Sequence, residues 1–114
     1  MGLITHNTSS GNHDEFTVAA VGDFEIFFRS NLVGESDSIT KRYINVPGGM
    51  GAKSGFIVPS AAIDIIQING QTMKIPMCIS TTGWYWPGFG NRAEVSYLKI
   101  YIRTANTILD VVVN

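Results

Sequence analysis

Apolar and polar residues alternate in short runs along this chain, and glycine, proline or asparagine separates most of the runs. In residues 24–29, for example, Phe24, Ile26 and Phe28 share one face of an extended strand. No stretch of about ten or more residues keeps the apolar period of an amphipathic helix. The runs recur about every 8 to 12 residues, which is typical of sandwiches and barrels. We therefore predict an all-β fold, a single-domain antiparallel β-sandwich of about eight or nine strands, with the jelly roll as one possible arrangement.

The strongest turn signal is Asn69-Gly70, which stands between the apolar runs 63–68 and 71–79. Asparagine and glycine tolerate the positive φ angles of a two-residue hairpin turn better than other residues do. We expect the strands to pair outward from this turn. Isoleucines occupy both faces of the first run, which indicates a central strand or a bulge.

Two further hairpins are predicted, one around residues 22–23 and one around residues 105–106. For the second of these, a single register sets apolar side chains opposite one another along a whole face. This agreement favours direct pairing of residues 93–104 with residues 107–113.

The composition favours assembly over an isolated monomer. The 114 residues suit one domain, but only 15% of them are charged, whereas about 25% is typical. A surface so poor in charge is adhesive unless it is covered. We therefore expect a homo-oligomer, with a trimer favoured, that contacts other structural proteins.

The chain divides into a polar N-terminal arm, residues 1–14, and a β-sandwich domain, residues 15–114. Turn-forming polar residues dominate the first segment, and within residues 2–14 Leu3 and Ile4 are the only large apolar side chains. We expect this arm to take part in assembly, anchored by Leu3 and Ile4.

Charge and hydropathy argue against nucleic-acid and membrane partners. The net charge is −1 and the basic residues are scattered, whereas nucleic-acid binding requires a basic face. The sequence shows neither a signal peptide nor an apolar run that could span a membrane. We expect a soluble cytoplasmic product, and the virion as its destination in the structural interpretation. The single cysteine, Cys78, excludes an internal disulfide and is expected to be a small buried residue.

No catalytic constellation, cofactor site or metal site is recognisable, so we do not expect an enzyme. The two histidines, His6 and His13, both lie in the predicted arm, where nothing would hold them beside a partner. They match no metal-ligand spacing. Residues 48–54 are rich in glycine but lack the glycine that precedes Lys-Ser in a phosphate-binding loop.

The most unusual segment is Trp84-Tyr85-Trp86, which holds both tryptophans of the chain. Alternation places Trp84 and Trp86 on one side of a strand and Tyr85 on the other. These side chains fill the core, form a subunit interface or bind a ligand, in that order of preference. The residues proposed for an interface or a ligand site are Trp84, Tyr85, Trp86, Phe89, Asn91 and Arg92.

The profile indicates a non-enzymatic structural protein that acts through oligomerisation. A small virion component of the capsid-decoration or tail-fibre-tip type has this profile, by analogy of composition alone. The alternative is a carbohydrate-binding module or lectin, because sugar rings stack on exposed aromatic faces while Asn and Arg bind hydroxyl groups. In that interpretation the partner is a glycan, bound by residues 84–92.

Overall fold

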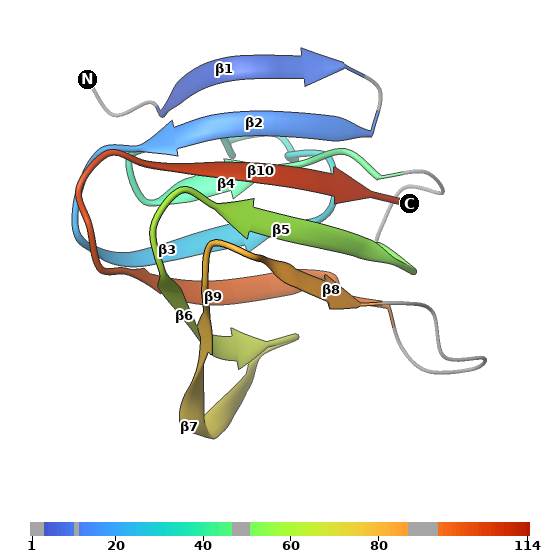
Figure 1. Cartoon of the computed structure of the whole chain (residues 1–114). Coiled ribbons are helices and arrows are strands. Elements are labelled where there is room, and N and C mark those ends of the chain that lie inside the picture. Colours follow the sequence, from blue (N-terminus) through green and yellow to red (C-terminus); the bar gives the residue numbers. More distant parts are fainter. Residues whose placement is uncertain (1–3, 11, 47–50, 87–93) are drawn as a thin grey trace.

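The computed structural model of the chain describes residues 4–10, 12–46, 51–86 and 94–114, with residues 6–10 described by their backbone alone. Within these ranges, ten strands form two five-stranded sheets that pack face to face (Figure 1). No helix in the described part could cross a membrane. The strands are β1 (Thr5–Ser10), β2 (His13–Val18), β3 (Gly22–Phe27), β4 (Lys41–Tyr43), β5 (Gly55–Pro59), β6 (Ile63–Ile68), β7 (Gln71–Ile79), β8 (Trp84–Trp86), β9 (Tyr97–Ile102) and β10 (Thr107–Val113).

The strand order is that of a jelly roll. The first sheet runs β1-β2-β10-β5-β8 and the second runs β4-β3-β9-β6-β7. Four antiparallel pairs, β6·β7, β5·β8, β3·β9 and β2·β10, enclose one another along the chain, and successive pairs lie in alternate sheets. This is one long hairpin rolled into two Greek keys. The predicted all-β sandwich is thus confirmed, and the jelly roll is its arrangement.

Two strands lie outside that eight-stranded framework. β4 pairs with β3 in parallel, so the second sheet is mixed rather than wholly antiparallel. β1 pairs with β2 and is an edge strand of the first sheet. The segment that we expected to be an arm therefore contains β1 and the start of β2, and Ile4 is buried in the core of its own chain. Polar side chains do not prevent an edge strand, because the backbone supplies its hydrogen bonds.

Two of the three predicted hairpins are wrong. Residues 22–23 and 105–106 lie in or beside connections that cross between the sheets, since β2 and β10 belong to one sheet and β3 and β9 to the other. The residues that we expected to pair across the last hairpin instead line the inner faces of opposite sheets. They are fully buried there: Leu98, Ile100, Ile102, Leu109, Val111 and Val113. Alternation identifies an inward face, but it does not distinguish a strand's neighbour from the strand across the core.

The Asn69-Gly70 turn is confirmed, with φ angles of 53° and 84°. Pairing runs outward from it as far as Gln67↔Thr72 and then shifts, so that Ile65 lies opposite Met77. β6 lies between β7 and β9 and is irregular in both pairings, as its isoleucines on both faces suggested. β7 carries the longer side of the irregularity, residues 73–76, and Pro76 falls within it, as expected of a residue that cannot donate to a ladder.

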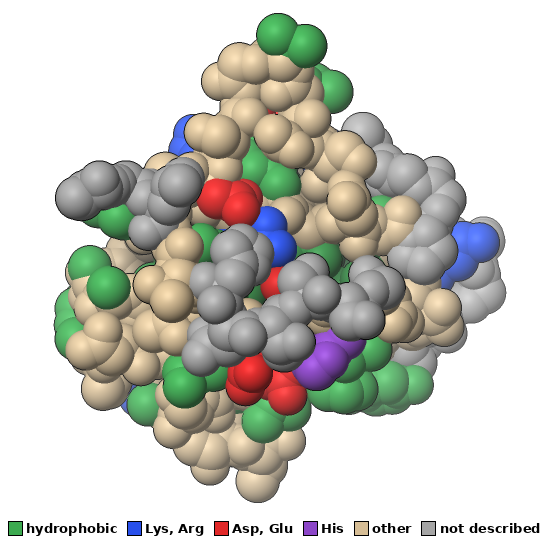
Figure 2. Space-filling view, turned by 90° about the horizontal axis from the view of Figure 1, so that it is seen from above, with side chains coloured by type: hydrophobic (Ala, Val, Ile, Leu, Met, Phe, Trp, Pro, Cys, Tyr) green, Lys and Arg blue, Asp and Glu red, His purple; other side chains and the backbone are tan. Residues whose placement is uncertain are grey.

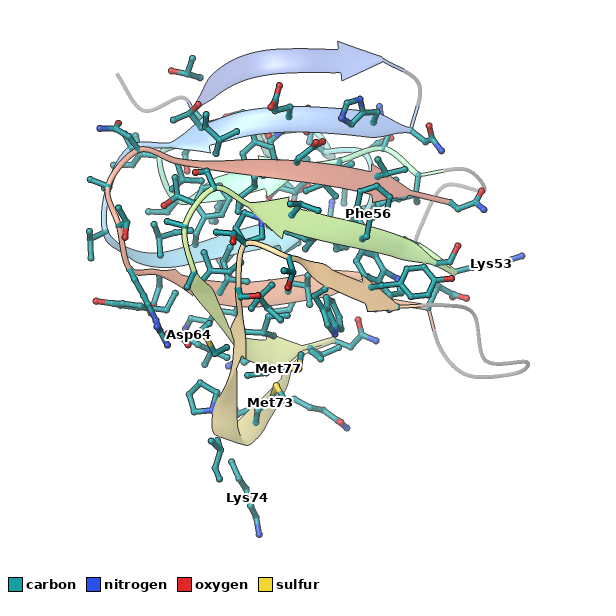
Figure 3. All side chains as sticks on the ribbon, viewed as in Figure 1. Lys53, Phe56, Asp64, Met73, Lys74 and Met77 are labelled. Atoms are coloured by element: carbon teal, nitrogen blue, oxygen red, sulfur yellow. The ribbon has the colours of Figure 1, made fainter. Side chains whose placement is uncertain are left out.

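This irregular hairpin extends from one end of the sandwich (Figure 1). Lys74 points away from the body, whereas Met73 and Met77 turn toward it and pack against the core (Figure 3). Cys78, which we expected to be buried, is exposed on β7. The expectation failed because β7 is an edge strand at which apolar neighbours in sequence do not guarantee burial.

Candidate functional site

The aromatic segment forms β8, the edge strand of the first sheet, which pairs with β5. The rings of Trp84 and Trp86 stack with their centroids 5.0 Å apart, and Tyr85 lies on the other side of the strand, as alternation predicts. Trp86 is only 5% exposed, and its Nε1–H donates to the carbonyl oxygen of Ala52 at 3.1 Å. Its indole therefore belongs to the core. Tyr85 is 63% exposed.

The backbone of β5 explains how the indole of Trp86 fits. A Cβ atom on Gly55 would lie 2.7 Å from the Trp86 ring and 2.5 Å from the carbonyl oxygen of Val112. Only glycine allows the ring and the neighbouring strand to approach so closely. Four other predicted residues, Leu3, Phe89, Asn91 and Arg92, lie outside the described residues.

An apolar surface extends inward from Tyr85 across the outer face of the first sheet. Tyr85 lies opposite Phe56 on β5, and Phe56 lies opposite Val112 on β10. Val58 and Ile108 continue this face on the same strands and are partly exposed. We call these five residues the apolar face; Phe56, labelled in Figure 3, lies at its middle. The only charged residue on β5, β8 and β10 is Asp110.

The outer face of the second sheet has the opposite character. Arg103 binds Asp64 through two hydrogen bonds of 2.8 and 2.6 Å. The Tyr97 hydroxyl donates to a Glu25 carboxylate oxygen at 2.6 Å. Burial, followed by this hydrogen bond, raises the pKa of Tyr97. Charged and hydrogen-bonded groups thus cover this face. On the apolar face, Asp110 lies opposite Val58 and is paired with His13, whereas Phe56 and Tyr85 stay exposed.

A second apolar feature lies in the connection between β3 and β4. Leu32 and Val33 occupy a β-turn closed by a hydrogen bond of 2.9 Å from Glu35 N–H to the Leu32 carbonyl, with Gly34 at φ 88°. Glycine suits the positive φ that a type II turn requires at this position. Both side chains are exposed. We call these two residues the Leu32-Val33 tip.

The tip is held from beneath by an ion pair. Arg29 donates to both carboxylate oxygens of Glu35, at 2.7 and 3.1 Å, and Leu32 N–H donates to the same carboxylate at 2.7 Å. The Arg29 hydrogen bonds, followed by the Leu32 bond, lower the pKa of Glu35 to about 2. The Arg29 guanidinium also lies 5.2 Å from the ring centroids of Phe27 and Tyr43. These contacts define the shape of the turn that presents two exposed aliphatic side chains.

A polar cavity of about 400 Å³ opens where β2, β4 and the connection before β4 meet. Asp14 and Arg42 line it, and both are buried. Their ion pair, Arg42 Nη2 to Asp14 Oδ2, spans 2.6 Å and joins the two sheets. In Figure 2 a basic side chain lies beside acidic ones near the middle of the view, with a histidine close by. The lining residues are Asn12, His13, Asp14, Asn31, Ser36, Asp37, Arg42, Tyr43, Ile44 and Asn45.

His13 lies on β2 and not in an arm, and its Nε2 is 2.5 Å from Asp110 Oδ1 on β10. Glu15 is the cross-strand neighbour of Asp110. In the part of the chain that the structure describes, no group of three or more His, Cys, Asp or Glu residues could hold a metal ion. The absence of an enzymatic activity stays a prediction.

Comparisons with protein families, curated proteins and solved structures find no match to this chain. A proposal about function therefore has to come from the surfaces just described. Sequence reasoning singled out Tyr85, which is exposed, but not Phe56, the Leu32-Val33 tip or the cavity. Two signals were available: Arg42 is a charged residue within a short strand, and Leu-Val-Gly-Glu is a turn that carries two aliphatic residues.

Proposed function

We propose that this protein is a non-enzymatic structural module that assembles with copies of itself through the apolar face. The observation that carries the proposal is the exposure of Tyr85 and Phe56 on three strands that hold a single charged residue. Interface cores are depleted in charge and enriched in aromatic residues. The low charge of the whole chain, 15%, is consistent with covered surface.

The occupant that we propose for the apolar face is the Leu32-Val33 tip of a second copy. The tip is held by Glu35 and Arg29, and the Arg29 guanidinium lies over Tyr43 of β4, at one end of the second sheet. The apolar face includes β8, at the opposite end of the first sheet. The Arg42–Asp14 pair places β4 beside β2, so the tip and Tyr85 belong to opposite edges of the sandwich. Contacts between different surfaces of identical chains form a closed ring or an open filament. With the two surfaces at opposite edges, three copies form the smallest ring. A trimer is accordingly the proposed stoichiometry.

The finer proposal is that the assembled module is a small virion component of the capsid-decoration or tail-fibre-tip type. Jelly rolls are common in viral capsids, but they also occur in lectins and cupins, so the fold alone does not decide. The supporting features are the small size, the low charge and an apolar face suited to permanent contact. Co-sedimentation of the chain with particles from its native source is the expected result, and its absence from purified particles would reject this finer proposal.

Sedimentation equilibrium over a wide concentration range tests the self-association. The informative variants are Phe56→Ser, Tyr85→Ser and Leu32→Ser, and the matched control is Tyr101→Ser. Phe56 and Tyr101 are both 37% exposed and lie on the outer faces of opposite sheets. We expect a trimer for the unmodified chain and for the control, and a shift to monomer in the other three variants, with the fold verified by NMR. A monomeric unmodified chain, or equal disruption by Tyr101→Ser, would contradict the proposal.

A further inference from the structure

The polar cavity is built on a charged pair placed at the end of the core. Asp14, Phe16 and Val18 are the inward positions of β2, so a carboxylate stands where the pattern places an apolar side chain. Arg42 meets it from the other sheet and lies 5.8 Å from the centroid of the Phe16 ring. An ion pair at such a position is a poor source of stability, because desolvation of both groups offsets their attraction. A contribution to the stability of the fold therefore does not by itself explain why the pair is there.

The charges at the cavity are largely satisfied by one another. Arg42 Nη1 donates to Asp37 Oδ2 at 2.8 Å and to the Tyr43 carbonyl at 2.5 Å. The other oxygen of Asp37 accepts from Tyr43 N–H at 2.8 Å. Both carboxylates thus share Arg42, and an incoming ion must compete with these contacts. Asp14 and Asp37 would repel a phosphate or carboxylate, and Arg42 would repel an ammonium group.

The remaining lining groups suit a neutral ligand that is rich in hydroxyl groups. Asn12, Asn31 and Asn45 each carry an amide, which combines donors with an acceptor. The Asn31 amide nitrogen already donates to the Glu35 carbonyl at 2.8 Å, and the Asn45 amide oxygen accepts from the Ser30 hydroxyl at 2.6 Å. The Asn12 amide, the Asn31 amide oxygen and the Asn45 amide nitrogen are the groups left for a ligand among the described residues. A sugar hydroxyl likewise donates and accepts. The residue Arg42 is 9% exposed, and its Nε–H has no acceptor among the described residues. This nitrogen is closed off from solvent, so a ligand in the cavity would lie near Arg42 without reaching its Nε–H.

From the cavity volume, the paired charges and the asparagine amides in its lining, we propose that this cavity binds a neutral saccharide unit. Its volume of about 400 Å³ falls within the range of small-molecule sites. The amide groups of these asparagines that remain available orient the hydroxyl groups. The site is separate from β8, where Trp86 is buried.

NMR titration tests the proposal with ¹⁵N-labelled protein, followed at the Asn side-chain amides and the Arg Nε–H. The probes are methyl glycosides of glucose, galactose and mannose, and N-acetylglucosamine. Inorganic phosphate and methylammonium serve as charged counter-probes. We expect at least one neutral sugar to cause saturable shifts at Arg42 Nε–H and at Asn12, Asn31 or Asn45. Saturable binding of a charged probe alone, or no saturable shift at the cavity with any sugar, would overturn the proposal.

Variants at the rim then assign the contacts without removing the buried ion pair. Asn12→Ala and Asn45→Ala are each expected to weaken sugar binding about fivefold, the effect of one lost hydrogen bond. Gln71→Ala, at the exposed β6–β7 turn, is the control and is expected to leave the affinity unchanged. Equal weakening by Gln71→Ala, or undiminished binding by both asparagine variants, would overturn the assignment of the site.

Discussion

At the scale of single residues, the Arg29–Glu35 pair shows how an exposed turn acquires a defined shape. The pair holds the turn with two side-chain hydrogen bonds, and Leu32 N–H adds a third to the same carboxylate. Exposed ion pairs contribute little on average, but bidentate arginine–carboxylate geometry restricts orientation. The consequence is local: the turn that carries Leu32 and Val33 is held in one conformation by contacts within its own chain.

The pH dependence of this pair follows from the lowered pKa of Glu35. Its pKa falls from 4.5 to about 2 in the folded chain. The stabilisation is therefore complete above about pH 4.5 and is lost as the pH falls toward 2. We expect the difference in urea midpoint between the unmodified chain and Glu35→Gln to narrow over this interval. In a ¹³C titration the Glu35 carboxyl should titrate near pH 2, and Arg29→Gln should raise the pKa of Glu35 toward 4.5. A Glu35 pKa that Arg29→Gln leaves unchanged would contradict this assignment.

At the scale of elements, the two asparagines with positive φ angles allow the cost of backbone strain to be compared with the contribution of side-chain hydrogen bonds. Asn69 and Asn106 have φ angles of 53° and 61°. The Asn69 side chain also accepts from Ser96 N–H at 2.7 Å and from Tyr97 N–H at 3.2 Å, and it donates to the Glu94 carbonyl at 3.0 Å. It thereby joins the β6–β7 turn to the start of β9.

Alanine at either position forces a side chain other than asparagine into the left-handed region, which costs about 1 kcal/mol. We expect Asn106→Ala to lower the free energy of unfolding by about this amount. Asn69→Ala should cost about 2 to 4 kcal/mol, because about 1 kcal/mol is added for each hydrogen bond lost. Urea denaturation measures both. Equal costs would show that the contacts of Asn69 contribute nothing beyond the turn.

These elements also show what the sequence could and could not predict. The Asn69-Gly70 hairpin was predictable because its turn chemistry and its strands are local in sequence. The inward faces of β3, β9 and β10 were predictable from alternation. The partners of those strands were not, since β2·β10 and β3·β9 join segments that are far apart along the chain. The cavity was beyond prediction for the same reason: Asp14 and Arg42 meet only through the rolled topology.

At the scale of the whole molecule, the jelly roll gives the two ends of the chain unequal roles. β10 lies inside the first sheet, between β2 and β5, and its inward side chains Leu109, Val111 and Val113 are fully buried. β1 lies at the edge of the same sheet and pairs with β2. Loss of β10 would divide the sheet, whereas loss of β1 would only remove one strand from its edge.

We therefore expect deletion of residues 1–10 to preserve the fold and deletion of residues 107–114 to abolish it. Removal of Ile4 from the core accounts for about 1.5 to 3 kcal/mol of lost stability in the first variant, because that is the contribution of one buried aliphatic side chain. The backbone groups of β2 that β1 leaves behind can bind water at the sheet edge, so they add little. The second variant exposes backbone groups of both β2 and β5 and opens the core. Dispersed amide NMR spectra with cooperative urea unfolding should be seen for the first variant alone, and a folded, cooperative chain that lacks residues 107–114 would contradict the central role of β10.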